Sequence, residues 1–131
     1  MGSNFTVKNF SVVVPIFNEE RILLNSAEQI YSICKRTNLD FELIFVENGS
    51  TDKTLTLIDS FVSENLECKV LTLELANYGN ALKQGFIHAK NQIVVSFDID
   101  YFSEDFLEKV LKLDKKFSGI TASKRLIKSD D

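Results

Sequence analysis

Asp98 and Asp100 stand one residue apart in the sequence FDIDYF, directly after the apolar run 93–95. In extended backbone, residues i and i+2 point the same way, so both carboxylates can reach a single point. Two acids aimed at one point repel each other unless a cation or a proton lies between them. Mg²⁺ and Mn²⁺ bind through one or two carboxylates, with water and substrate phosphates as further ligands. The pair therefore predicts a divalent metal site, the alternative being two solvated acids that favour the following helix terminus.

A second polar stretch, ENGSTD at residues 47–52, offers groups that suit a nucleoside. Gly49 permits a tight turn, and the Asn48 amide can both donate to and accept from a base edge. Pro15 and Phe17 could flank the same base, and Glu19 could bond ribose hydroxyls. Taken one at a time, each of these residues is better explained by an ordinary strand–turn–helix junction than by a binding role.

A third stretch, NYGNALK at residues 77–83, is a glycine-containing loop that opens a helix. Backbone N–H groups at such a position suit an anion, to which Lys83 could add charge. The spacing matches neither the dinucleotide fingerprint nor the phosphate-binding P-loop. His88, the one histidine, falls on the polar side of its helix and is predicted to be a solvated surface residue.

The elements that must position these residues alternate between two hydrophobic periods. β-branched and apolar runs predict strands at residues 11–17, 41–46, 69–75 and 93–97, and a short fifth strand at 119–123. Apolar residues at helical spacing predict helices at residues 20–36, 52–64 and 80–90, and one that starts at Ser103. Asp52 is expected to cap its helix, and the tail from Lys124 onward is expected to be loose.

Strict alternation of strands and helices predicts an α/β fold, a Rossmann-like three-layer sandwich whose mostly parallel sheet carries helices on both faces. The length suits one domain, residues 1–131. In such sheets ligands bind outside the carboxyl ends of the strands, near a switch in strand order. The polar stretches at 15–20, 47–52, 76–80 and 98–100 all fall at that edge, which is the first sign of a site.

Composition narrows the classes of partner. The formal net charge of −4, with scattered lysines, argues against nucleic acid as a partner. Cys34 and Cys68 are predicted to be inert packing residues in a reducing compartment. The sequence shows no apolar run of membrane-spanning length and no signal peptide, so we expect a cytoplasmic protein, with any membrane association made through a partner.

Four segments, in this order, resemble the nucleotide-sugar-binding half of a family 2 glycosyltransferase with the GT-A fold, in the group of dolichyl-phosphate mannose synthases and related polyprenyl-phosphate sugar transferases. VVVPIFNEE (12–20) resembles the family's opening strand with its P-x-Y/F-N-E turn, and VENGSTDKT (46–54) resembles V-D-D-G-S-T-D-x-T. NYGNALKQGF (77–86) resembles N-x-G-x-x-x-A-x-x-x-G-F, and the FDID of residues 97–100 resembles the metal-binding D-x-D. The resemblance runs over about residues 10–125.

This resemblance implies inverting transfer of a sugar from a nucleoside-diphosphate sugar, linked to UDP or GDP, with Mg²⁺ or Mn²⁺ held by Asp98 and Asp100. It implies nucleotide-binding roles for Pro15, Phe17, Glu19, Glu47, Asn48, Lys83 and Asp98, with Arg125 as an assisting residue. Asn48 stands where the family has an acid, so the base preference stays open.

The family domain continues past this length, and its later half supplies the acceptor site and the general base. We assign no residue of this chain as the general base, and we do not assign that role to Glu104 or Asp105. The acceptor could be a polyprenyl phosphate or a glycan. The alternative is a truncated or accessory nucleotide-sugar-binding module without turnover of its own, and a homo-oligomer or a second subunit could cover its exposed apolar surface.

Overall fold

Five parallel strands form one sheet in the computed structural model, which describes residues 7–113 and 125–128. The strands are β1 (Asn9–Ile16), β2 (Asp40–Asn48), β3 (Cys68–Leu73), β4 (Ile93–Ser96) and β5 (Arg125–Lys128). Their order is β3-β2-β1-β4-β5, so the order reverses direction between β1 and β4. All the strand pairs are parallel, as the alternating pattern predicts.

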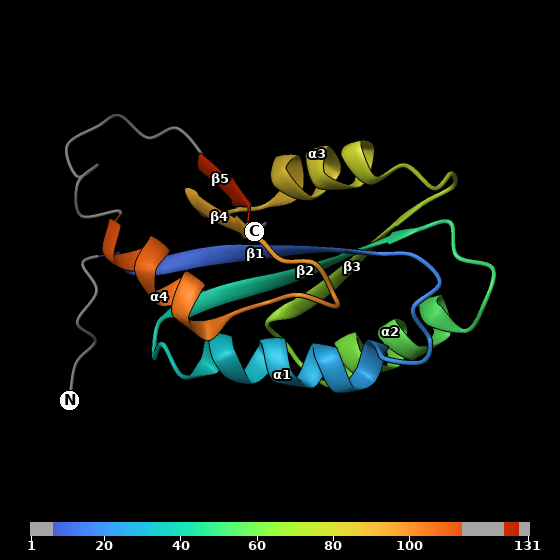
Figure 1. Cartoon of the computed structure of the whole chain (residues 1–131), viewed down its shortest axis with the longest axis horizontal. Helices are drawn as coiled ribbons and strands as arrows, with labels where there is room; N and C mark the ends of the chain where they lie inside the picture. Colours follow the sequence, from blue (N-terminus) through green and yellow to red (C-terminus); the bar gives the residue numbers. More distant parts are fainter. Residues whose placement is uncertain (1–6, 114–124, 129–131) are drawn as a thin grey trace.

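Four helices complete a three-layer sandwich (Figure 1). They are α1 (Leu23–Lys35), α2 (Thr54–Ser63), α3 (Tyr78–His88) and α4 (Glu104–Leu113). Helix α3 covers one face of the sheet, and α1, α2 and α4 lie on the other (Figure 1). This arrangement confirms the predicted Rossmann-like α/β fold.

Strand β1 shows how one sequence serves both faces. Val12 and Val14 pack with α1, α2 and α4, whereas Val13 packs with α3. Successive side chains of a strand point to opposite faces, so a strand covered on both sides must be apolar throughout. This is why the central strands read as continuous apolar runs rather than as an alternating pattern.

The buried carboxylate of Glu42 interrupts the apolar interior on the α3 face, near the amino ends of the strands. Glu42 is 2% exposed, and its Oε2 accepts hydrogen bonds from the Ser11 hydroxyl (2.6 Å) and from the Lys90 backbone N–H. Its Oε1 lies 2.8 Å from Lys69 Nζ, as an ion pair rather than a well-directed hydrogen bond. Burial acts to raise the pKa of Glu42, but these partners outweigh burial and lower it. The carboxylate thus stays charged and ties β1, β2 and β3 to the loop before β4.

Several local predictions are confirmed. Helix α4 begins at Glu104, directly after Ser103, and the structure adds that the Ser103 hydroxyl accepts a hydrogen bond from the Phe106 N–H (3.0 Å). Both cysteines are free and buried, and burial raises their pKa values, that of Cys68 to about 12. His88 is exposed.

Other local predictions need correction. Helix α1 begins at Leu23 rather than at residue 20, because the preceding residues form a turn. Asp52 lies one residue before the N-cap of α2, although its Oδ1 still accepts the Thr54 N–H (2.8 Å). The expectation of a loose tail from Lys124 is wrong for Arg125–Lys128, which pairs with β4 as an edge strand, and the rest of that tail lies outside the described residues. The predicted strand at 119–123 lies outside the described residues.

Gly85 sets how closely α3 approaches the sheet. A Cβ added at this position would clash with Val13 Cγ1 and would lie 3.2 Å from Val46 Cγ2. Both valines belong to the strands that α3 covers, and both are fully buried. The absent side chain therefore lets the helix backbone lie against β1 and β2.

We predict that Gly85→Ala lowers the free energy of unfolding by about 1–3 kcal/mol, because an added methyl group in a packed core forces its neighbours apart. Gly79→Ala is the matched control in the same helix, since a Cβ there meets only Asn77 Oδ1 at 3.6 Å. That control should change stability by under about 1 kcal/mol, in the stabilising direction. Urea denaturation measures both, and an unchanged midpoint for Gly85→Ala would contradict the close approach.

Candidate functional site

A hollow of about 260 Å³ opens at the carboxyl ends of β1, β2 and β4, and we call it the strand-end pocket. It lies where the strand order reverses, the position at which parallel α/β sheets bind ligands. Its lining residues are Pro15, Ile16, Phe17, Glu19, Asn48, Tyr78, Asp98, Ile99 and Asp100. Six of these were predicted from the sequence, so the fold brings three separate sequence stretches to one place.

Pro15 helps to create this opening between β1 and β4. The main-chain groups of Val13 face β4, since its carbonyl accepts the Phe97 N–H (3.0 Å). Two residues further on, Pro15 faces the same neighbour, but proline has no N–H to donate. The register of β1 with β4 ends at Val13, and the chain after β4 turns away. Pro15 and Ile16 lie beyond the last residue of β1 that pairs with β4, and both line the floor of the strand-end pocket.

Asn18 ties the loop after β1 to the loop after β2. Its backbone adopts the left-handed region (φ 51°), which asparagine tolerates better than most residues. Its Oδ1 accepts the N–H groups of Thr51 (2.8 Å) and Asp52 (3.3 Å), and its own N–H donates to Ser50 Oγ (2.9 Å). The neighbouring Glu19 N–H donates to Thr54 Oγ1 (2.8 Å). The two polar stretches therefore act as one rigid unit that fixes the pocket wall.

Glu47 and Asn48 take different roles although they are adjacent. The buried Glu47 carboxylate accepts the Ser50 N–H within its own turn, and this residue does not line the pocket. Asn48 does line it, and its Oδ1 accepts the Asn77 N–H (2.9 Å). That bond assigns the orientation of the amide and leaves the Nδ2 group as the donor for a ligand.

Gly49 holds the next loop against this wall. Its φ of 77° is in the left-handed region, and a Cβ added there would lie 2.9 Å from the Glu74 carbonyl oxygen. Both constraints require glycine. The sequence indicated the turn, but only the structure reveals that the loop after β3 crosses so closely over it.

The two aspartates lie in a turn, so the prediction that they stand in extended backbone is wrong. Strand β4 ends at Ser96, and the Asp98 carbonyl accepts the Tyr101 N–H (3.0 Å). Ile99 is 3% exposed and anchors this turn in the core. Asp98 and Asp100 nevertheless both line the pocket. The buried Ile99 between them, rather than strand geometry, explains why both aspartates lie at the same pocket.

Tyr78 is the site residue that sequence reasoning missed. It is the first residue of α3, and its hydroxyl donates to Asp98 Oδ1 (2.8 Å) across the pocket. An aromatic residue between an asparagine and a glycine was visible in the sequence. Its partner was not, because the two are 20 positions apart and belong to different elements.

Acidic groups converge on this pocket. Burial raises the pKa of Glu19, and repulsion from Asp100 and Asp52 raises it further. The carboxylate of Asp100 therefore acts on Glu19 across the gap between the β1 and β4 loops. A site in which negative charges oppose one another favours a bound cation.

These donors fit a hard divalent cation that also binds substrate. Among residues 7–113 and 125–128, no three or more histidine, cysteine or acidic side chains are arranged to hold a metal by themselves. Mg²⁺ commonly takes one or two carboxylates and completes its shell with water and phosphate oxygens. The Asp98 and Asp100 pair matches that donor set.

The remaining candidates lie elsewhere. Lys83 is exposed on α3 and does not line the pocket. Arg125 begins β5, and its side chain is outside the described part of the molecule. Glu104 pairs with Arg36 (2.9 and 3.0 Å), and Asp105 pairs with Lys109 (3.2 Å). Neither acid lines the pocket.

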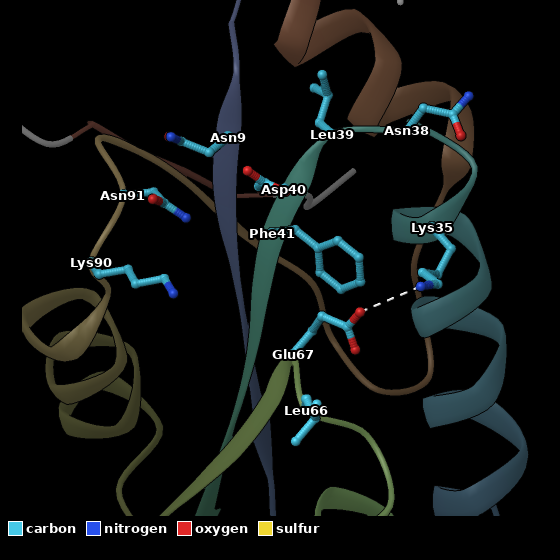
Figure 2. Close-up of a pocket in the computed structure, with 10 residues that line it drawn as sticks. All are labelled: Asn9, Lys35, Asn38, Leu39, Asp40, Phe41, Leu66, Glu67, Lys90 and Asn91. Carbon is cyan, nitrogen blue, oxygen red and sulfur yellow. Dashed lines mark hydrogen bonds and ion pairs between the residues drawn. The ribbon is translucent and has the colours of Figure 1, made fainter.

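A larger hollow, of about 630 Å³, lies at the opposite edge, by the amino ends of β1 and β2 (Figure 2). Its charged groups include Lys35 and Glu67, which pair with each other (3.3 Å). The Tyr31 hydroxyl also donates to Glu67 (2.8 Å), so this carboxylate is already satisfied. We place the functional site at the smaller hollow, because ligands of parallel α/β sheets bind at the carboxyl edge.

The fold and the pocket define the class: a doubly wound α/β protein with an acid-lined site at the switch in strand order. Residues 11–131 match the family Glycosyl transferase family 2, and the chain belongs to that family. Within the described residues, no helix combines the length and apolar character needed to cross a membrane.

The chain is similar to the undecaprenyl-phosphate 4-deoxy-4-formamido-L-arabinose transferase of Pectobacterium carotovorum, with 32% identity over 96 residues, 72% of this chain and 29% of that protein. Among solved structures, S. aureus TarS 1-349 has a TM-score of 0.60 and 29% identity, over 82% of this chain and 32% of the other. The mannosyltransferase PcManGT of Pyrobaculum calidifontis, solved with GDP-Man and Mn²⁺, has a TM-score of 0.66 and 24% identity, over 79% of this chain and 32% of the other. Its fold agrees with the GT-A assignment. The chain thus spans about a third of the length of these proteins.

We predict that Glu19→Gln stabilises the protein at neutral pH. Folding raises the pKa of Glu19 above its ordinary value of 4.5. As the pH rises from 4.5 through the raised pKa, the carboxyl ionises and the folded state loses stability relative to the unfolded state. Glutamine carries no charge, so the variant should gain stability at pH 7, by under about 1 kcal/mol for a partly exposed group, and nothing near pH 3.5.

Thermal melts at the two pH values measure this difference. Glu28→Gln, at an exposed position on α1, is the control and should behave alike at both. A Glu19→Gln gain that is larger at the acidic pH would contradict the assigned repulsion.

Proposed function

We propose that this chain binds a nucleoside-diphosphate sugar in the strand-end pocket and contributes to inverting glycosyl transfer. The observation that carries the proposal is the convergence of Phe17, Asn48 and the Asp98/Asp100 pair on one hollow at the switch in strand order. A base, a ribose and a diphosphate need a stacking surface, directed hydrogen bonds and a cation, and this hollow offers candidates for each.

The nucleoside part is assigned to the β1 and β2 side of the pocket. Phe17 is 41% exposed, so its ring is available to pack against a base. Asn48 offers its amide N–H groups to an acceptor on the base edge, and Glu19 suits ribose hydroxyls. Pro15 is buried and shapes the floor beneath them. Glu47 supports Asn48 by holding the turn that follows both residues, through the Ser50 N–H.

The diphosphate part is assigned to the β4 side. Asp98 and Asp100 would hold Mg²⁺ or Mn²⁺ there, and a bound cation would stabilise the negative charge that develops on the leaving diphosphate. The acids cannot bind a diphosphate directly, because like charges repel. Lys83, on α3, remains a proposed source of positive charge for the same group.

The similar proteins support this assignment. One solved relative contains GDP-Man and Mn²⁺, and S. aureus TarS 1-349 has been solved with UDP. The name of the curated relative indicates an undecaprenyl-phosphate substrate. A polyprenyl phosphate is therefore the acceptor class we favour, and it would account for association with a membrane. Family membership favours turnover over the alternative of a binding module without activity.

We predict that Asp98→Asn and Asp100→Asn each abolish the Mn²⁺-dependent part of nucleoside diphosphate binding. Removing a carboxylate from a two-carboxylate site leaves the cation too few charged ligands. Calorimetry with UDP and with GDP, each with and without Mn²⁺, measures the effect. Asp105→Asn is the matched control, because Asp105 is an exposed acid on α4 that pairs with Lys109.

Unchanged binding in both variants would remove the metal role, provided that their melting temperatures equal that of the wild type. Turnover is tested separately, by release of nucleoside diphosphate from a sugar nucleotide with a polyprenyl phosphate present. Binding without release would support the module interpretation.

A further inference from the structure

Tyr78 reaches across the strand-end pocket to the first acid of the pair. Its hydroxyl donates to Asp98 Oδ1 at 2.8 Å. We propose that Tyr78 is a positioning residue that orients the Asp98 carboxylate for a divalent cation, an inference that rests on the proposed function.

The backbone at Tyr78 is held from two sides. The preceding Asn77 donates its N–H to Asn48 Oδ1 (2.9 Å), which ties it to the end of β2. The Asn77 Oδ1 in turn caps α3 by accepting the Asn80 N–H (2.9 Å). The loop leading to Asn77 packs closely over Gly49. The Tyr78 ring therefore projects from a helix start that hydrogen bonds hold against the end of β2. These contacts set the position of its hydroxyl.

The Asp98 main chain is fixed independently. Its carbonyl accepts the Tyr101 N–H (3.0 Å) in the turn that carries both acids. That bond sets the backbone but not the rotation of the carboxylate. The Tyr78 hydroxyl supplies the missing restraint, because it occupies Oδ1 and leaves Oδ2 for a cation. Hydrogen bonds of this kind typically change metal affinity by 10–100-fold.

The chemistry of the donor also matters. The site gathers negative charge, because Glu19, Asp98 and Asp100 line one pocket. A lysine or arginine could orient Asp98 equally well, but its positive charge would compete with the cation for the same carboxylate. A tyrosine hydroxyl donates a hydrogen bond without adding charge. It can restrain the ligand while leaving its full negative charge to the metal.

The test replaces Tyr78 by phenylalanine, which keeps the ring and removes the donor. Electron paramagnetic resonance of free Mn²⁺ gives the Mn²⁺ dissociation constant in the presence of UDP and, separately, of GDP. We expect Tyr78→Phe to weaken Mn²⁺ binding about 10-fold, with a melting temperature that matches the control. Tyr101→Phe is that control, since Tyr101 lies in the same turn, is 55% exposed and contacts Asp98 through its backbone.

A second measurement is calorimetry of UDP and of GDP without Mn²⁺. If Tyr78 acts through Asp98 and the cation, Tyr78→Phe should leave this metal-independent nucleotide binding unchanged. Equal or tighter Mn²⁺ binding by Tyr78→Phe, compared with wild type, would overturn this inference and leave the proposed function standing. A wild-type protein that binds no Mn²⁺ with either nucleotide would overturn both.

Discussion

The site depends on one side chain, Asn18, that joins the ends of two neighbouring strands. Parallel pairing brings the carboxyl ends of β1 and β2 to one edge but does not fix the loops that follow them. Asn18 does so by accepting two N–H groups from the loop after β2 and donating its own N–H to Ser50. Together with the bond from the Glu19 N–H to Thr54 Oγ1, this connection holds the loop that carries Phe17 and Glu19 beside the end of β2, where Asn48 lies.

At the same edge, acidic side chains repel one another, and a bound cation would reduce this repulsion. Glu19, Asp98 and Asp100 line one pocket, and burial together with repulsion from Asp100 and Asp52 raises the pKa of Glu19. Elsewhere in the described structure, acids such as Glu42, Glu67 and Glu104 meet partners that lower their pKa values. The contrast distinguishes acids that stabilise the fold through partners from Glu19, whose neighbours in the pocket are other acids.

The rest of the molecule keeps this edge rigid. Helix α3 lies against β1 and β2 because Gly85 has no side chain, and its amino end carries Tyr78 to the pocket. At the opposite edge, the buried Glu42 ties three strands to the loop before β4. Packing on both faces thus fixes the positions from which the four loops emerge, and the loops then need only a few hydrogen bonds to define the site.

The sequence by itself determined the α/β class, the four helices, the first four strands and the edge at which the site lies, because hydrophobic period and strand–helix alternation are local properties. It also identified six of the pocket residues, since these lie at the carboxyl ends of strands or just after them. Tertiary structure alone decided the turn at Asp98, the strand Arg125–Lys128 and the bond from Tyr78 to Asp98. Each of these is a contact between residues of separate elements, or depends on a buried anchor such as Ile99. No local pattern encodes such contacts, because they exist only once the sheet has brought its strands together.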